Sequence, residues 1–193
     1  RLGGGRDDVG RNPTAHLAGG AVRDFLTHLT YLGLHYFPGV AIGDVDARWA
    51  NRSRNPYIGA DDFDARIELG EAVVHLRFDA RIAPDAFRVW VRGTAGSVET
   101  AFYHPFLRTE VRRGPKLLSP IVNHAVNGVG LATSGVRNLR DKVLQKSPYH
   151  GLWRFLERFY ESVLDGTPPP VTREDVLRTN ELVDRMVEIA SAR

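Results

Sequence analysis

The stretch FDARIELGEAVVHLRF, residues 63–78, decides the fold of this chain. Apolar and polar residues alternate along both of its halves, and the pair Gly70-Glu71 separates them. A period of two residues is typical of a β-strand with one buried face, and a short connection containing glycine joins antiparallel neighbours. The stretch therefore predicts an antiparallel hairpin.

The same alternation continues on both sides of this hairpin. Residues 45–49 precede it, and residues 87–91 and 97–102 follow it, with turn-rich connections between them. Short connections favour an antiparallel meander. The outer face carries both signs of charge on neighbouring strands, so it is either solvated and salt-bridged or a face between subunits.

Helical spacing frames the strands. Apolar residues recur at steps of three and four over residues 21–36, and Ser119-Pro120 marks the start of a helix that runs with interruptions to about residue 145. A further helix follows Ser147-Pro148 and ends at Gly166, and Thr172 with Asp175 forms a capping box for the last one. The order of elements predicts an α+β fold, in which helices pack on one face of a sheet.

The composition excludes several classes of protein. The chain of 193 residues has no cysteine, so neither a disulfide nor a thiolate site is available. Its net charge of +3 comes from scattered arginines, which does not indicate a nucleic-acid partner. No apolar run approaches the roughly 20 residues that cross a bilayer, and the first 20 residues do not resemble a signal peptide. We expect a cytoplasmic protein with no membrane partner.

The helix over residues 21–36 carries a second, polar stripe. Asp24, His28, Tyr31 and His35 follow one another at steps of four, three and four residues, so they project from nearly one side. A carboxylate one turn before an imidazole can orient the ring for acid/base chemistry. The alternatives are the wet face of an amphipathic helix or, less favoured by the sequence, a metal site at Asp24, His28 and His35.

Other residues are weaker candidates. Gly19 and Gly20 allow a close backbone approach to a cofactor, or they only shape the turn before the helix. Three polar clusters lie near the ends of elements, where each either binds a substrate hydroxyl or is plain surface: Tyr103-His104, Asn123-His124 and Tyr149-His150. The chain has no Gly-x-Gly-x-x-Gly motif and no phosphate-binding loop, so we expect no nucleotide site of its own.

Three stretches give the chain a family resemblance. They are AGGAVRD at residues 18–24 followed by His28, GTAGSVE at residues 93–99, and GTPPPVT at residues 166–172 followed by Glu174 and Asp175. Together they resemble the C-terminal domain of the Gfo/Idh/MocA oxidoreductases, the family of glucose-fructose oxidoreductase and inositol dehydrogenase. The stretches span nearly the whole chain, in the order of the family.

The resemblance implies a fold and an activity. The fold is an open, mostly antiparallel sheet with helices on one face and a subunit contact on the other, in a homodimer or homotetramer. Residues 21–193 form this domain, and residues 1–20 lead in from an N-terminal Rossmann domain that lies outside the chain and binds NAD or NADP. The whole protein transfers hydride to or from a sugar, polyol or related hydroxy compound, and this chain alone is inactive.

The resemblance also assigns roles to residues. Asp24 orients and His28 is the acid/base or hydroxyl-binding group; Gly19 and Gly20 approach the cofactor; no metal takes part. We expect Tyr31, Asn123, His124 and Tyr149 to contact the substrate. Many members of the family have an aspartate at the position of Tyr31, and this departure favours an alternative, a non-catalytic binding or dimerisation module of the same fold.

Overall fold

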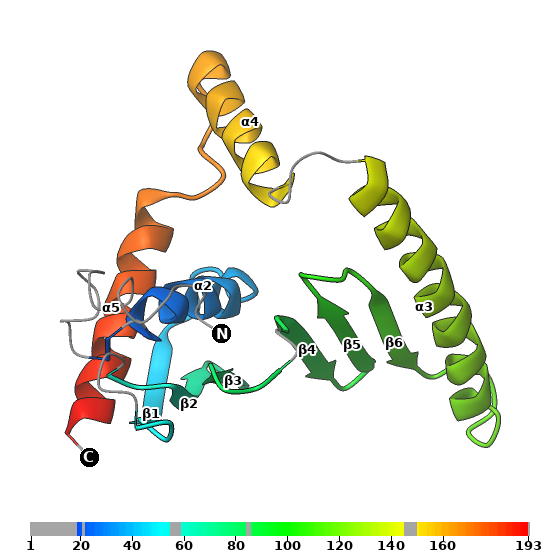
Figure 1. Cartoon of the computed structure of the whole chain (residues 1–193), viewed down its shortest axis with the longest axis horizontal. Coiled ribbons are helices and arrows are strands. Elements are labelled where there is room, and N and C mark those ends of the chain that lie inside the picture. The colour runs from blue at the N-terminus through cyan, green and yellow to red at the C-terminus, as the bar shows by residue number, and fades with distance from the viewer. Residues whose placement is uncertain (1–18, 21, 55–58, 84–85, 145–149, 193) are drawn as a thin grey trace. The chain divides into compact units, whose positions relative to one another are not determined.

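The structure is a computed structural model, and it describes residues 19–20, 22–54, 59–83, 86–144 and 150–192. The chain divides into two compact units (Figure 1). Unit 1 takes Arg1–Ile82 and Arg158–Arg193, and unit 2 takes Ala83–Glu157. Unit 1 thus combines the N-terminal and C-terminal parts of the chain.

Unit 1 is built on a three-stranded antiparallel sheet in the order β1-β2-β3. The strands are β1 (Ile42–Ala50), β2 (Asp62–Leu69) and β3 (Ala72–Asp79). β2 and β3 form the expected hairpin, with Ala65 opposite Leu76. The alternation of apolar and polar residues puts the apolar side chains of all three strands on one face, where they enter the core.

Two helices complete unit 1, α2 (Val22–His35) and α5 (Arg173–Ser191), which pack on each other and on the sheet. The largest buried side chains come from both helices and from β2: Leu26, Phe63, Ile67, Leu182 and Met186. Gly33 lies where α2 approaches β3, since a Cβ there would be 3.2 Å from a methyl group of Val74. The core therefore joins segments that lie far apart in the sequence.

The start of α5 agrees with the sequence. Thr172 accepts a hydrogen bond from the backbone of Asp175, whose carboxylate accepts one from the backbone of Thr172 in return, which confirms the capping box. Gly166 has φ of +65°, as expected after the end of a helix. Within the first turns of α5, Arg178 donates hydrogen bonds to the carbonyls of Phe37 and Val40 and so ties α5 to the segment that follows α2.

Unit 2 has its own antiparallel sheet, in the order β4-β5-β6, and one long helix. Its elements are β4 (Arg88–Gly93), β5 (Gly96–Ala101), β6 (Leu107–Val111) and α3 (Ser119–Leu144). The sequence predicted β4 and β5 but missed β6. The helix is continuous, whereas the sequence suggested interruptions.

Polar side chains attach α3 to β6. The amide of Asn127 accepts from the backbone N–H of Thr109 at 3.0 Å and donates to the carbonyl of the same residue at 2.9 Å. One turn earlier, Asn123 donates to the carbonyl of Val111 at 2.9 Å. β6 is an edge strand, so these amides take the place of a neighbouring strand and satisfy backbone groups that would otherwise be unpaired.

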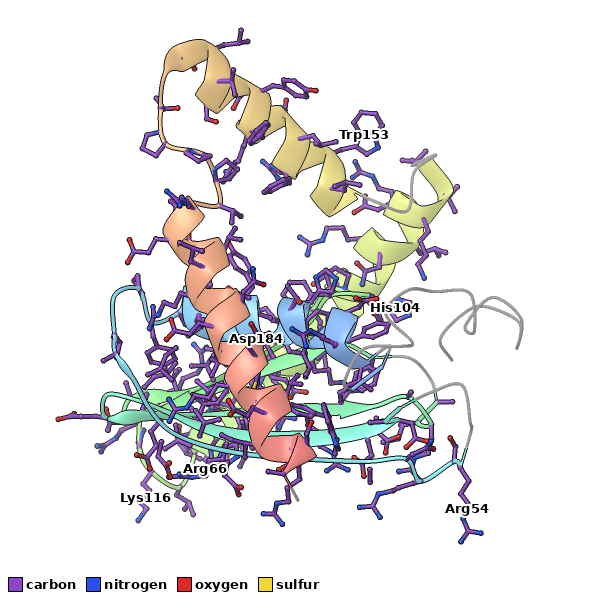
Figure 2. The ribbon with its side chains drawn as sticks, turned by 90° about the vertical axis from the view of Figure 1, so that its left-hand side faces the viewer. Arg54, Arg66, His104, Lys116, Trp153 and Asp184 are labelled. Carbon is purple, nitrogen blue, oxygen red and sulfur yellow. The ribbon has the colours of Figure 1, made fainter. Side chains whose placement is uncertain are left out.

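The α+β class is confirmed, but the strands form two separate ladders rather than one hydrogen-bonded sheet. Some apolar positions are also more exposed than their spacing indicated, including Val91 at 46% and Val176 at 47%. On α4 (His150–Asp165), Ser162 is the only buried side chain among those described, and Trp153 projects from the helix (Figure 2). None of the described helices is both long and apolar enough to cross a membrane.

Two leucines of α5 test the core of unit 1. Leu182 is 2% exposed and Leu177 is 57% exposed on the same helix. We expect Leu182→Ala to lower the free energy of unfolding by about 3 kcal/mol, because it removes buried methyl groups and leaves a cavity. Leu177→Ala is the matched control and should change stability by less than about 0.5 kcal/mol. Urea unfolding followed by circular dichroism measures both, and equal losses would contradict this core.

Candidate functional site

Four side chains form what we call the α2 polar face: Asp24, His28, Tyr31 and His35. With 3.6 residues per turn, they fall within about 60° of one another around the helix axis. The buried residues of α2 occupy the opposite side: Val22, Leu26, Thr30 and Leu34. The spacing argument from the sequence is thus confirmed, and the four side chains project from the side of the helix that faces away from the core.

The orientation of α2 is fixed by contacts near its N-terminal end. Arg23 forms an ion pair and hydrogen bond with Asp184 of α5, which is labelled in Figure 2. The ring of Phe25 stacks on that of Phe78 from β3, with the centroids 4.9 Å apart. These contacts and the buried stripe hold the helix in one rotation, so the α2 polar face is presented by a fixed element.

Asp24 and His28 are both exposed at the surface of unit 1. Neither side chain forms a hydrogen bond or an ion pair within the part of the chain that the structure describes. Residues four apart on a helix have Cβ atoms about 5–6 Å from each other, so a ligand on this surface could contact both. The pair thus offers a carboxylate and an imidazole with unused hydrogen-bonding groups.

Tyr31 and His35 lie at the other end of the α2 polar face. Their rings are in contact, with centroids 5.8 Å apart, and Tyr31 is half-buried. Burial, together with the negative charge of Asp175, raises the pKa of Tyr31 above its ordinary value. The phenol therefore stays protonated at neutral pH and can donate a hydrogen bond, which an aspartate at this position could not do.

Gly19 and Gly20 have a packing role in unit 1. Both are buried and have positive φ, +83° and +55°. A Cβ on Gly19 would lie 2.5 Å from the ring of Trp49, and a Cβ on Gly59 would lie 3.1 Å from the backbone nitrogen of Gly20. The ring of Trp49 already fills the space beside Gly19, so among the described residues no room for a cofactor remains there. The cofactor contact of the two glycines stays a prediction.

The remaining predicted substrate residues lie outside unit 1. Asn123 and His124 belong to unit 2, and Tyr149 falls outside the described residues. The amide of Asn123 is engaged within unit 2, since its oxygen accepts from Nε of Arg113 at 2.9 Å and its nitrogen donates to Val111. His124 is exposed on α3, with Nδ1 2.7 Å from the carbonyl oxygen of Pro120. Their contact with a substrate stays a prediction.

A groove in unit 2 runs along the line where β6 and α3 meet. It has a volume of about 950 Å³, and its lining includes His124, Asn127 and the charged side chains Arg108, Arg112 and Lys116. This groove was not predicted from the sequence, because β6 was not expected. It is the cavity of unit 2 that contains the predicted residues Asn123 and His124.

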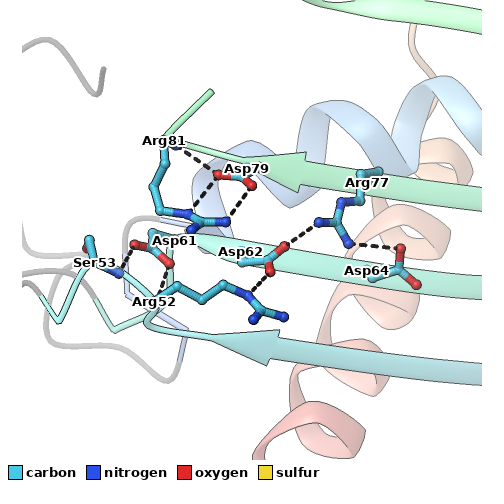
Figure 3. A network of polar contacts seen from close by, with 8 residues as sticks. All are labelled: Arg52, Ser53, Asp61, Asp62, Asp64, Arg77, Asp79 and Arg81. Carbon is cyan, nitrogen blue, oxygen red and sulfur yellow. Dashed lines mark hydrogen bonds and ion pairs between the residues drawn. The ribbon is translucent and has the colours of Figure 1, made fainter. Parts of the chain in front are cut away.

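A carboxylate and arginine network at one end of the sheet in unit 1 was also missed (Figure 3). Asp61 is 1% exposed and accepts hydrogen bonds from the backbone of Arg52 at 2.8 Å and of Ser53 at 2.7 Å. The network continues through ion pairs of Asp62 with Arg52 and Arg77 and of Asp79 with Arg81. These contacts tie Arg52 and Ser53, which follow β1, to the start of β2, which identifies the network as structural.

The sequence signal for this network was the mixed charge of neighbouring strands. Asp64 lies opposite Arg77 across the β2–β3 ladder, and the two side chains form an ion pair at 3.4 Å. The outer face is therefore salt-bridged at this point, and its role as a face between subunits stays a prediction. Among the described residues, no group of three or more histidines, aspartates and glutamates is placed to hold a metal ion.

Comparison with known proteins adds no family to this picture. No protein-family model, no curated protein and no solved structure matches the chain. The resemblance to the Gfo/Idh/MocA oxidoreductases therefore depends on the sequence stretches alone, and the roles that it implies stay predictions.

Two glycines with similar backbone angles separate packing from backbone strain. Gly19 has φ of +83° and lies against Trp49, whereas Gly39 has φ of +71° and nothing within 4 Å of its missing Cβ. Alanine at either position is strained by positive φ, at a cost of about 1 kcal/mol or more. We expect Gly19→Ala to lower the melting temperature clearly more than Gly39→Ala, because only Gly19 also meets a ring. Equal losses would contradict the packing role.

Asp61 predicts a dependence of stability on pH. Burial raises the pKa of Asp61, but hydrogen bonds from the Ser53 side chain and from the Arg52 and Ser53 backbone outweigh burial and lower it below the ordinary value of 3.8. Its stabilising contribution is therefore present above pH 3.8 and is lost as pH falls through the lower pKa of the folded state. Asp61→Asn should cost about 2 kcal/mol at pH 7 and flatten this acid dependence.

The control for this prediction is Asp44→Asn, a change at an exposed carboxylate of β1. We expect it to change the free energy of unfolding by less than about 0.5 kcal/mol. Urea unfolding at several pH values between 2 and 7 compares both variants with the native chain. An Asp61→Asn variant with native stability at pH 7 would show that the segment between β1 and β2 does not depend on this carboxylate.

Proposed function

We propose that this chain is the substrate-binding part of a NAD(P)-dependent oxidoreductase that acts on a sugar, a polyol or a related hydroxy compound. The observation that carries the proposal is the pair Asp24 and His28, exposed without partners among the described residues on a helix whose rotation is fixed. The resemblance of residues 18–28 to the Gly-Gly and Asp-x-x-x-His segment of the Gfo/Idh/MocA family supports it.

The residues of the α2 polar face suit the chemistry of a hydroxyl group. In the proposal, His28 takes the proton from the substrate hydroxyl during oxidation and returns it during reduction, as a general acid/base requires. Asp24, one turn earlier, orients the imidazole or accepts a second hydroxyl of the substrate. Tyr31, which stays protonated because its pKa is raised, donates a hydrogen bond to a further oxygen.

In this proposal the chain contributes little to binding the cofactor. A bound nicotinamide would accept or donate the hydride, and the proposal assigns its nucleotide to an N-terminal Rossmann domain. Since Trp49 occupies the space beside Gly19, we assign no step to the Gly19-Gly20 turn. The contribution of this chain is to bind the polyol and to move the hydroxyl proton at His28.

A second candidate function is a non-catalytic binding or dimerisation module. The observation that favours it is the exposed apolar surface of α4, where Trp153 is 65%, Tyr160 64% and Leu164 84% exposed. Apolar side chains gathered on one helix are typical of a surface that another protein covers. This function would need neither Asp24 nor His28, so the two candidates differ in what a substitution at His28 does.

Turnover by the full-length protein tests the proposal. We expect the native protein to oxidise at least one sugar or polyol with NAD or NADP, and His28→Ala to lower kcat/KM by a hundredfold or more, since it loses the group that moves the proton. Because His28 is exposed, the melting temperature of the His28→Ala variant should stay within a few degrees of the native value. Absorbance of the reduced nicotinamide measures the rate.

Thr27→Ala is the matched control, because Thr27 is the exposed neighbour of His28 and its hydroxyl faces the carbonyl of Arg23 on its own helix. It should leave kcat/KM within twofold of the native value. Native and His28→Ala proteins that both lack turnover, and that also fail to bind NAD and NADP, would exclude the oxidoreductase and favour the binding module.

A further inference from the structure

We propose that the groove between β6 and α3 binds the phosphate group of a small, soluble phosphomonoester. The groove lies wholly in unit 2 and shares no residue with the α2 polar face, so the inference goes beyond the proposed oxidoreductase and does not depend on it. Four observations support it: the charge of the lining, the rigidity of the walls, the hydrogen-bonding group of His124, and the size of the space.

The charged side chains of the lining have a positive balance. Arg108, Arg112 and Lys116 line the groove against one acidic residue, Glu110. Arg108 is an ion-pair partner of Glu110, whereas Arg112 and Lys116 form no ion pair within the described part of the chain. Two positive charges therefore remain for a ligand, and Lys116 projects from the turn before α3 (Figure 2).

The walls of the groove are held in place. The amides of Asn123 and Asn127 fix α3 against the backbone of β6 at 2.9–3.0 Å. Ser119 adds a third link, since its hydroxyl donates to the carbonyl of Val111 at 3.2 Å and accepts from the backbone of Arg113 at 2.9 Å. A ligand would thus lie between backbone elements that these hydrogen bonds already hold together, which limits the entropy lost on binding.

His124 adds a defined hydrogen-bonding group to the same lining. Its Nδ1 lies 2.7 Å from the carbonyl oxygen of Pro120, and a carbonyl can only accept, so Nδ1 carries the hydrogen. Nε2 is therefore the ring nitrogen that remains for a ligand, as an acceptor from a hydroxyl or, once the ring is protonated, as a donor to phosphate. The first turn of α3 contains no acidic residue that would oppose an anion.

A phosphomonoester fits these features better than a single carboxylate does. Its second pKa is near 6, so at pH 7 it carries nearly two negative charges, which match the two free cations. The guanidinium of Arg112 can bind two phosphate oxygens at once. The space of about 950 Å³ exceeds what a phosphate alone needs, and Leu131 offers an apolar surface to the organic part of the ligand.

Calorimetric titration with glycerol 3-phosphate tests the inference, with glycerol and sodium sulfate as comparison ligands. We expect saturable binding of glycerol 3-phosphate, none of glycerol, and binding of sulfate at least fivefold weaker. The double variant Arg112→Gln, Lys116→Gln should lower the affinity for glycerol 3-phosphate at least tenfold, because both unpaired cations are removed. The double variant Arg137→Gln, Arg140→Gln changes exposed arginines of α3 outside the lining and should bind within twofold of native.

Three results would overturn the inference: no saturable binding up to about 10 mM, equal affinity for sulfate, or native affinity in the Arg112, Lys116 variant. Sedimentation with vesicles that contain phosphatidic acid separates a lipid headgroup from a soluble ligand, and vesicle binding without glycerol 3-phosphate binding would also overturn it. The titration contains no nicotinamide, and it measures binding and not turnover. The failure of the groove and the failure of the proposed oxidoreductase can therefore be told apart.

Discussion

Unit 1 depends on the apolar contact of α2 and α5 with each other and with the sheet. Leu26 of α2, Phe63 of β2 and Met186 of α5 are far apart in the sequence, and all three are fully buried in one cluster. Burial of such side chains contributes about 1.5–3 kcal/mol each, more than any exposed ion pair of the unit. The contact also decides the chemistry, because a helix that buries one stripe must turn the opposite stripe outward. The exposure of Asp24 and His28 is a consequence of where Val22 and Leu26 lie.

Unit 2 is held together in a different way. Its described residues bury little apolar surface, and the buried side chains of α3 are polar: Ser119, Asn123 and Asn127. Hydrogen bonds to an edge strand hold this helix, and each contributes only about 1 kcal/mol net to stability. A buried donor or acceptor left without its partner would cost more than this. Such an interface has strict geometry, since an amide must meet a backbone N–H and carbonyl at the same time. The groove beside it therefore lies between elements that these hydrogen bonds hold together.

Each unit contains two kinds of polar residue, those with partners inside the unit and those without. In unit 1, Asp61 and Asp62 are engaged in hydrogen bonds and ion pairs that hold the residues around them, whereas Asp24 and His28 have no such partner among the described residues. In unit 2, Asn123 binds the backbone of β6, whereas Lys116 forms no hydrogen bond or ion pair with any residue that the structure describes. Side chains without an internal partner on a rigid element are the ones that a ligand can use at least cost. This distinction, and not residue type, separates the candidate sites from the structural networks.

The sequence by itself determined the α+β class, the hairpin of residues 63–78, the capping box at Thr172 and the shared face of Asp24 and His28. These features depend on periods of 2 and 3.6 residues and on local capping chemistry, which a single segment expresses without help. Only the tertiary structure showed that β6 exists, that Asn123 binds a strand, and that Trp49 fills the space beside Gly19. Each of these depends on a partner distant in the sequence. No local period of the sequence encodes such a partner. An asparagine or glycine has the same sequence pattern whether it belongs to a binding site or to a packed interface.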